Sequence, residues 1–511
     1  MRATIGSLLI AFLLLAVMTQ TALATPAQPT PEMVEALVDA VVQGQLDATG
    51  VPGATVAVVL GGETILAKGY GVADVEDGRI ADADTLFRIG SIGKLFTFTA
   101  VMQLVEQGRL DLHEDINTYL DFELPHTLEY HPFRGDPGPI TLAHLLTHTA
   151  GFEDARGNGY FLDAADMPSL ADTMRERMPA RIFRPGEAVA YSNYGAALAG
   201  YIVERVAAQP FAEYVEEHVF APLSMDRSTF AQPLPLDLAP HLARASRVVG
   251  GELQRDRFVF TAMTPAGSTS TTASDMARFV LAHLGDGGAV LAPETLESMH
   301  TRQFGHHPRL DGMAFGFVER TVNGQRTLFH GGDIFSFQSG LFLLPEHDVG
   351  LFVSYSGGGY GEPLTLFHTF LDTFYPDAAS EPPRQDAGAA DRSRAFVTAS
   401  RTTRRHRPVR RRGTSLLPHS RHGQHPLPRT PSPHAHPHRH RHRHHARPSS
   451  RVSVRAPEPS SARLRMMERA APFAHHACWH RAARTTPPPT AASPHPDAAR
   501  RTGNADMLRH G

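Results

Sequence analysis

Cysteine, tryptophan and lysine are scarce in this chain of 511 residues. Its single cysteine, Cys478, excludes a disulfide within the chain, so the fold must depend on its apolar core. Only Lys68 and Lys94 are lysines, and the other 47 of the 49 basic residues are arginines. If a lysine amine takes part in chemistry, the choice is therefore between these two.

Two common hydrolase signatures are also missing. No Gly-x-Ser-x-Gly elbow and no His-Glu-x-x-His occurs, which removes support for an α/β-hydrolase or a zinc peptidase. His434, His436, His438 and His440 could bind a metal adventitiously, but they lack an accompanying aspartate and lie in low-complexity sequence. We expect no catalytic metal and no cofactor.

The longest apolar run lies at the N-terminus. It extends from Ile5 to Val17 after Arg2, and Ala22-Leu23-Ala24 follows as a small-residue cleavage site. This order predicts a secretory signal peptide over residues 1–24, and hence export to a periplasmic or extracellular location. The run is short for a transmembrane helix. An uncleaved membrane anchor is the alternative, and no membrane-spanning segment is expected after cleavage.

Charge divides the chain in two. Residues 401–511 carry 23 arginines and four acidic residues, a net charge of +19, whereas residues 1–400 carry 26 basic and 48 acidic residues, a net charge of −22; the sum is −3. A basic tail invites a nucleic-acid hypothesis. Its lack of lysine and its aperiodic Pro-, His- and Ala-rich composition instead favour a disordered or out-of-frame tail after a linker at 377–400. We expect no nucleic-acid partner.

Residues 25–376 are predicted to form one folded domain. Strand patterns occur near both of its ends, and helical patterns dominate between residues 110 and 291. We expect an α+β fold (an α/β sandwich): an antiparallel sheet built from both ends, flanked by helices, with a mostly helical inserted subdomain. The expected helices are 31 to about 44–50, 91–108, 141–146, 169–178, 194–208, 211–219, 273–284 and 362–374, and the expected strands are 54–60, 63–70, 314–322, 326–330, 340–344 and 350–355.

Ser91 and Lys94 form a Ser-x-x-Lys pattern at the start of an apolar helical segment. If Ser91 opens that helix, Lys94 lies one turn further along the same face and its amine can reach the serine hydroxyl. A lysine in a poorly solvated pocket has a lowered pKa and can act as the base for a serine nucleophile. The pattern by itself fits a serine helix cap with a solvated lysine equally well.

Two further stretches could enter a cleft between the sheet and the inserted helices. In Tyr191-Ser192-Asn193, a tyrosine near a lysine can have a lowered phenol pKa and relay a proton, and Asn193 can donate to or accept from a substrate amide or ester. His330-Gly331-Gly332-Asp333 ends a predicted strand, where exposed N–H groups can hold an oxyanion. Taken singly, the first stretch is usually a turn and the second a β-bulge.

His144 and His148 flank the sequence Leu145-Leu146-Thr147 and are candidates for a general base. We favour a structural role, in which they satisfy buried backbone groups at a helix end.

Taken together and in this order, Ser91-x-x-Lys94, Tyr191-x-Asn193 and His330-Gly331-Gly332 resemble the motifs of the serine β-lactamase and penicillin-binding-protein superfamily. The resemblance is greatest to its class C β-lactamase-like branch, which includes esterases and D-amino-acid peptidases. It spans residues 30–376 and none of the tail. Supporting stretches are Leu142 to Gly151, Pro185-Gly186-Glu187 and Pro265-Ala266-Gly267.

The resemblance implies a serine hydrolase that forms an acyl-enzyme on an ester or amide of a small molecule or peptide. Ser91 would be the nucleophile, Lys94 and Tyr191 would share the proton relay, and Asn193 would orient the substrate. The alternative is a non-catalytic module of the same fold that binds peptidoglycan fragments or a partner protein. The complete set of Ser, Lys, Tyr and Asn argues against that alternative. Nothing in the sequence predicts the oligomeric state.

The third motif carries the remaining implied roles and one departure. His330, Gly331 and Gly332 would contact substrate, and the backbone N–H groups of Ser91 and Asp333 would form the oxyanion hole. In the superfamily this motif usually begins with a lysine that holds a substrate carboxylate, whereas an unperturbed histidine is mostly neutral at pH 7. Unless His330 is protonated or an arginine substitutes, we expect an esterase, amidase or peptidase acting on less acidic substrates.

Overall fold

The computed structural model describes residues 29–125, 137–154, 159–249, 252–359 and 361–377. The expected signal peptide, the linker after residue 377, and the tail with Cys478 and the histidine-rich run lie outside these residues. Within them, no helix combines the length and apolar character needed to cross a membrane.

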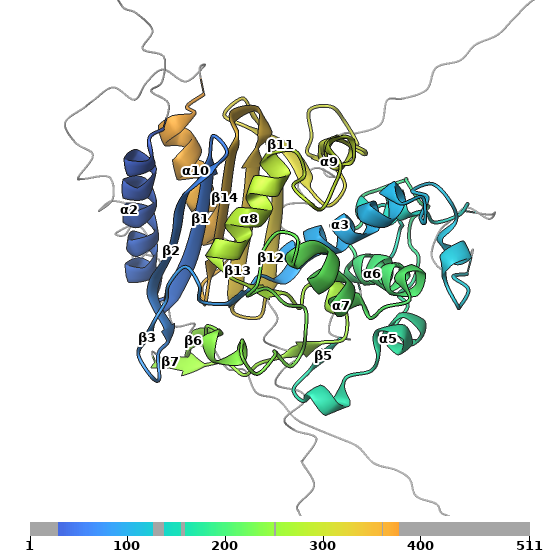
Figure 1. Ribbon diagram of the computed structural model, residues 1–511, viewed down its shortest axis with the longest axis horizontal. Coiled ribbons are helices and arrows are strands. Elements are labelled where there is room, and N and C mark those ends of the chain that lie inside the picture. Colours follow the sequence, from blue (N-terminus) through green and yellow to red (C-terminus); the bar gives the residue numbers. More distant parts are fainter. Residues whose placement is uncertain (1–28, 126–136, 155–158, 250–251, 360, 378–511) are drawn as a thin grey trace, which may run out of the picture. The chain divides into compact units, whose positions relative to one another are not determined.

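One eight-stranded sheet joins the two ends of the domain, as expected (Figure 1). The strand order is β10-β11-β12-β13-β14-β1-β2-β3, and every neighbouring pair is antiparallel. Near the middle, β1 (Gly53–Leu60) pairs with β14 (Val349–Tyr355). The other strands are β2 (Glu63–Asp74), β3 (Arg79–Ile80), β10 (Gly312–Met313), β11 (Val318–Val322), β12 (Gln325–Ile334) and β13 (Phe337–Leu344).

Helices cover both faces of the sheet (Figure 1), so its central strands β1, β13 and β14 are buried along nearly their whole length rather than on alternate residues. Val56 and Val58 pack toward α2 (Pro31–Thr49) and α10 (Gly361–Phe374), whereas Ala57 and Val59 belong to the core shared with α3 (Gly93–Glu106) and α8 (Ala273–Leu284). Helix α2 starts where Thr30 accepts a hydrogen bond from the Met33 N–H, and it ends at Gly50, whose φ is 73°.

The inserted region is built around α3, which is buried along most of its length (Figure 1). Its other helices are α4 (Leu142–Leu146), α5 (Leu170–Glu176), α6 (Asn193–Ala207), α7 (Phe211–Val215, continued by a π-helical turn at Glu216–Phe220) and α9 (Pro293–His300). The structure also contains three short ladders: β4 (Phe87–Arg88) with β9 (Ser270–Thr271), β5 (Tyr160–Phe161) with β8 (Phe260–Thr261), and β6 (Ser246–Val249) with β7 (Glu252–Arg255).

The expected fold class is confirmed, and the differences have local causes. The motif His330-Gly331-Gly332-Asp333 lies at the end of a strand, as expected, but the strand expected at 326–330 is longer, because β12 continues to Ile334 and pairs with β13 up to Phe337. The strand expected at 314–322 starts only at Val318, since Gly316 has φ 88°. Helix α9 and the β6–β7 hairpin were not expected. Their sequences are polar and lack a clear apolar period.

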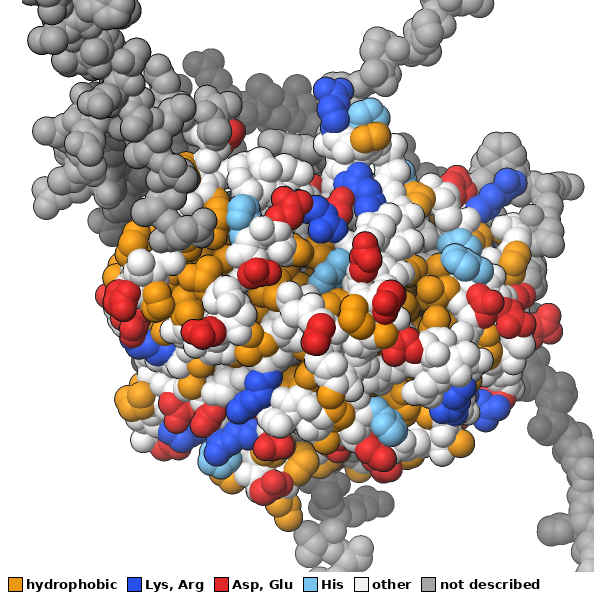
Figure 2. Space-filling model, turned by 45° about the horizontal axis from the view of Figure 1, so that its top comes forward, with side chains coloured by type: hydrophobic (Ala, Val, Ile, Leu, Met, Phe, Trp, Pro, Cys, Tyr) orange, Lys and Arg blue, Asp and Glu red, His pale blue; other side chains and the backbone are white. Residues whose placement is uncertain are grey.

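Acidic and basic side chains are interspersed on the face shown in Figure 2. This face therefore has no basic stripe of the kind that follows a nucleic-acid backbone.

Candidate active site

Ser91 and Lys94 lie where a 3₁₀ turn (Gly90–Ile92) passes into α3. The continuous turn places Lys94 above Ser91, and its Nζ is 3.0 Å from the Ser91 Oγ. Ser91 is partly exposed, whereas the Lys94 side chain is fully buried. The reading in which this lysine is solvated is therefore wrong, and the hydroxyl remains accessible next to a buried amine.

The Lys94 amine has two further partners, both of which can only accept. Its Nζ donates to the Asn193 Oδ1 at 2.8 Å and to the Ala266 carbonyl at 2.7 Å. Burial lowers the pKa of Lys94 to about 7, opposed by the negative charge of Asp154. When the amine is neutral, its two N–H groups satisfy Asn193 and Ala266, and its lone pair is left for the Ser91 proton. This is the arrangement of a general base.

The turn that supplies the Ala266 carbonyl is itself attached to α3. The Thr97 Oγ1 donates to the Pro265 carbonyl at 2.7 Å, one helical turn beyond Lys94. Sequence reasoning assigned no role to Ala266 or to Asp154. A carbonyl group is common to all residues and leaves no side-chain signal, and nothing in the sequence places Asp154 near Lys94.

Tyr191 packs over the same amine. The Lys94 Nζ lies 5.0 Å from the centroid of its ring, and its hydroxyl oxygen is buried. Burial raises the pKa of the Tyr191 phenol, and a hydrogen bond with the Ser91 side chain opposes this only in part. The phenol pKa is therefore raised and not lowered as it could have been beside a lysine, because desolvation outweighs the hydrogen bond with Ser91. In this geometry Lys94 is the stronger candidate for the base.

His148 holds the segment that carries Tyr191 from both sides. Its carbonyl accepts from the Ala190 N–H at 2.8 Å, and its Nδ1 accepts from the Ser192 N–H at 3.3 Å. Its ring centroid is 4.2 Å from that of Tyr191. Burial keeps the pKa of His148 well below its ordinary value, so the ring is neutral.

The structural role expected for the two histidines is confirmed. His144 Nδ1 accepts from the Thr141 N–H at 3.1 Å and closes a capping box at the start of α4. His148 has the left-handed φ of 55°, which non-glycine residues seldom adopt.

The third motif lies on an edge of β12 that β11 does not cover. Pairing between β11 and β12 stops at Val318 opposite Phe329, whereas β13 continues to pair with residues 330–334. The edge of residues 330–334 that β11 leaves uncovered faces the turn before α3. A Cβ on Gly332 would lie 2.0 Å from the Ile89 carbonyl oxygen, and one on Gly90 would lie 2.7–2.8 Å from the Asp333 backbone. Only glycines permit this approach.

His330 and Asp333 each have a defined side-chain contact. His330 is 5% exposed, donates from Nδ1 to the Gly331 carbonyl at 2.8 Å, and has its ring centroid 6.4 Å from that of Tyr191. The Asp333 Oδ1 accepts from the Gln338 Nε2 at 3.1 Å. The structure thus places the residues of all three motifs around one partly exposed serine hydroxyl.

Comparison with known proteins gives the family of this arrangement. The family model described as Beta-lactamase matches residues 38–366, which include all three motifs. The chain belongs to the β-lactamase family.

Individual relatives are distant. The chain is 27% identical over 336 residues to the protein flp of Staphylococcus aureus (strain MW2), a match that covers 62% of each chain. This chain therefore spans about three-fifths of the length of the staphylococcal relative. A structure of the octameric penicillin-binding protein homologue from Pyrococcus abyssi matches with a TM-score of 0.58 and 23% identity over 66% of this chain and 76% of that one. EstCE1, described as a hydrolase with promiscuous acyltransferase activity, matches with a TM-score of 0.58 and 22% identity over 68% of this chain and 99% of that one. These structural matches confirm the fold of the family.

Proposed function

We propose that this protein is an exported serine hydrolase that cleaves esters or amides through an acyl-enzyme on Ser91. The hydrogen-bond set of Lys94 carries the proposal, because a buried amine with a pKa of about 7 faces the Ser91 hydroxyl and two oxygens that can only accept. A binding module needs no such proton acceptor.

In the proposed first step the Ser91 Oγ attacks the substrate carbonyl carbon and its proton passes to the Lys94 Nζ. The carbonyl becomes a tetrahedral oxyanion, which collapses when the bond to the leaving alcohol or amine breaks and that group takes up a proton. Tyr191, in contact with both Ser91 and Lys94, would pass the proton between the amine and the leaving group. Water then attacks the acyl-enzyme, with Lys94 again as base.

The oxyanion is assigned to the backbone N–H groups of Ser91 and Asp333. The close packing of the Asp333 backbone against Gly90 supports this assignment, since it brings the β12 edge beside the residue that precedes the nucleophile. Loss of one such donor in other hydrolases costs about 3–4 kcal/mol of transition-state stabilisation. Asn193 would orient the substrate amide or ester while it holds Lys94, and His330, Gly331 and Gly332 would line the substrate beside β12.

We propose uncharged esters as the preferred substrates. Asp154 is close enough to raise the pKa of Lys94, and Asp154 and Asp333 both raise that of Tyr160. These negative charges disfavour a substrate carboxylate. The description of EstCE1 as a hydrolase with acyltransferase activity is in keeping with such acyl chemistry.

The test is covalent labelling of the purified full chain with a fluorophosphonate probe, followed by peptide mapping. We expect one modified peptide that contains Ser91, no labelling of Ser91→Ala, and unchanged labelling of Ser298→Ala, a control in α9. Labelling that survives in Ser91→Ala would refute the nucleophile. A folded native protein that neither labels nor hydrolyses p-nitrophenyl esters would favour the non-catalytic module.

Substrate preference is tested by kcat/KM for a neutral p-nitrophenyl ester and for its analogue with a terminal carboxylate. We expect the neutral ester to be preferred by at least about tenfold, which corresponds to one charge repulsion of about 1.4 kcal/mol. A preference for the carboxylate analogue, or faster turnover of a penicillin, would refute the substrate proposal and leave the nucleophile standing.

A further inference from the structure

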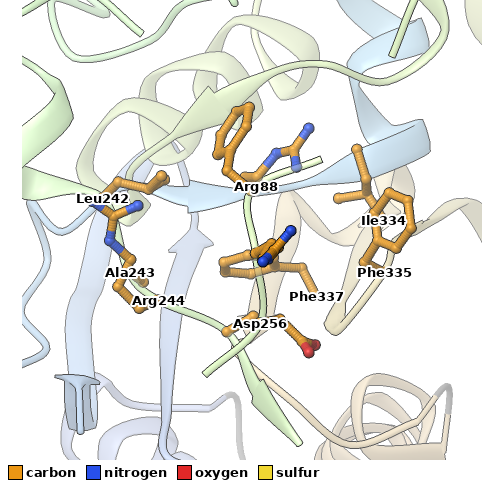
Figure 3. Close-up of a pocket in the computed structure, with 11 residues that line it drawn as sticks. Arg88, Leu242, Ala243, Arg244, Asp256, Ile334, Phe335 and Phe337 are labelled. Carbon is orange, nitrogen blue, oxygen red and sulfur yellow. The ribbon is translucent and has the colours of Figure 1, made fainter. Parts of the chain in front are cut away.

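A small cavity lies behind the segment that leads to Ser91. Its volume is about 20 Å³, and its wall includes Arg88, Phe258, Ile334, Phe335 and Phe337 (Figure 3). Arg88 precedes Ser91 by three residues, and Ile334 directly follows Asp333. The cavity therefore lies between β4, which leads to the turn that carries Ser91, the end of β12, which carries Asp333, and the loop at 256–259.

Arg88 has too few hydrogen-bond partners for a buried cation. Arg88 is only 3% exposed, and its Nη1 donates to the Val259 carbonyl at 2.9 Å. Its Nε and Nη2 are buried without a hydrogen-bond partner in the described part of the chain. One face of the guanidinium is covered by the Phe258 ring, whose centroid is 4.2 Å from the Cζ. Three N–H groups of a charged side chain thus lack an acceptor, which costs several kcal/mol if left so.

The acidic residue in the cavity wall does not compensate this charge. Asp256 forms an ion pair with the Arg247 Nε at 3.0 Å and accepts a hydrogen bond from the Ser336 Oγ. The wall also includes Arg244 and Arg257. Burial lowers the pKa of Arg88 to about 10, so it stays charged at neutral pH. The cavity is therefore electropositive, and a neutral water would satisfy its hydrogen bonds without balancing its charge.

We propose that this cavity binds one small monovalent anion of about the size of chloride, held by the Nε–H and Nη2–H groups of Arg88. The volume favours a small ion, because 20 Å³ is little more than the roughly 10–15 Å³ needed for one water. The bound anion would join β4, the loop at 256–259 and the β12–β13 turn. This site is separate from the proposed acyl chemistry and does not depend on it.

Thermal unfolding of the full chain tests the proposal. Chloride replaces gluconate at constant ionic strength, so that general screening does not change. We expect the Tm to rise by about 2–3 °C for each tenfold increase in chloride above the Kd, and Arg88→Met to abolish this rise. Arg181→Met is the matched control: Arg181 is 5% exposed and donates its Nη1 to the Pro125 carbonyl at 3.1 Å, but it is not part of this cavity. It should keep the chloride effect.

A second measurement serves if Arg88→Met does not fold. Crystals of the native chain grown with bromide should show an anomalous peak within hydrogen-bonding distance of the Arg88 Nε and Nη2. A cavity that holds only water in such crystals would overturn the proposal. An equal chloride effect in the native protein, Arg88→Met and Arg181→Met would overturn it as well, because it would be general salt stabilisation.

Discussion

Asn193 and Lys94, 99 residues apart, are joined by a 2.8 Å hydrogen bond from the lysine Nζ to the amide Oδ1. The side chain proposed to orient substrate therefore also positions the proposed base. Asn193 starts α6 and Lys94 lies in the first turn of α3, so the packing of these two buried helices fixes the amine. Chemistry at this site depends on that helix–helix contact.

The pH dependence of kcat/KM reports the charge on Lys94. Burial lowers its pKa to about 7, and only the neutral amine can take the Ser91 proton. The active fraction is therefore small below this pKa and complete above it. We expect kcat/KM for a neutral ester to rise with pH along a limb with an apparent pKa near 7. A profile that is flat through neutral pH would contradict Lys94 as the base.

Asn193→Asp should move that limb to higher pH. A carboxylate beside the Lys94 Nζ favours the ammonium and should raise the apparent pKa by about 1–3 units, so activity at neutral pH falls and recovers in alkali. Asn323→Asp, in the turn between β11 and β12, where the Asn323 side chain donates to Asp372, is the control and should leave the profile unchanged. If Asn193→Asp lowers kcat equally at all pH values, the electrostatic link between the two residues is disproved.

Gly90→Ala should reduce kcat by more than its loss of unfolding free energy explains. Gly90 has φ 53°, and an added Cβ would lie 2.7–2.8 Å from the Asp333 backbone. The substitution must push β12 away from Ser91. Gly50→Ala is the matched control, since Gly50 has φ 73° and open space around the added Cβ. Each variant should lose about 1–2 kcal/mol of unfolding free energy from backbone strain, but only Gly90→Ala should lose roughly tenfold or more in kcat.

His148→Leu tests whether this residue positions Tyr191. The variant leaves the Ser192 N–H without its acceptor and removes the ring beside Tyr191, so we expect a loss of about 1–3 kcal/mol in unfolding free energy. We also expect kcat to fall while the pKa of the pH–rate limb stays near that of Lys94. His144→Leu, which breaks a comparable cap in α4, should reduce stability but spare kcat. Equal kcat values for the two variants would contradict a positioning role.

A buried histidine pair should make the protein sensitive to acid. The His283 Nδ1 and His300 Nε2 are 3.0 Å apart, and burial lowers the pKa of both side chains, that of His300 from 6.5 to about 4. The unfolded chain thus binds more protons between these values, and the unfolding free energy must decrease as the pH falls from 6.5 toward 4. Denaturant titrations across this range should show a loss on the order of a few kcal/mol. His300→Gln should weaken this dependence, and an identical dependence in the variant would exclude His300 as a source.

Several elements follow from local sequence, because their signals are local. Thr30 and Gly50 mark the ends of α2, and the glycine turn between β1 and β2 sets that hairpin. The C-terminal limit of β12, in contrast, could not be predicted from the local sequence. Its extension past His330 depends on pairing with β13, and a single strand contains no record of where its neighbour stops.

The sequence by itself determined the fold class, the Ser91–Lys94 spacing and the three motifs, because helix period, strand pattern and motif spacing are properties of neighbouring residues. Only the tertiary structure decided that Lys94 is buried, that Asn193 and the Ala266 carbonyl hold its amine, and that the Tyr191 phenol pKa is raised rather than lowered. These properties arise from desolvation and from contacts between segments that are distant along the chain. Packing creates both.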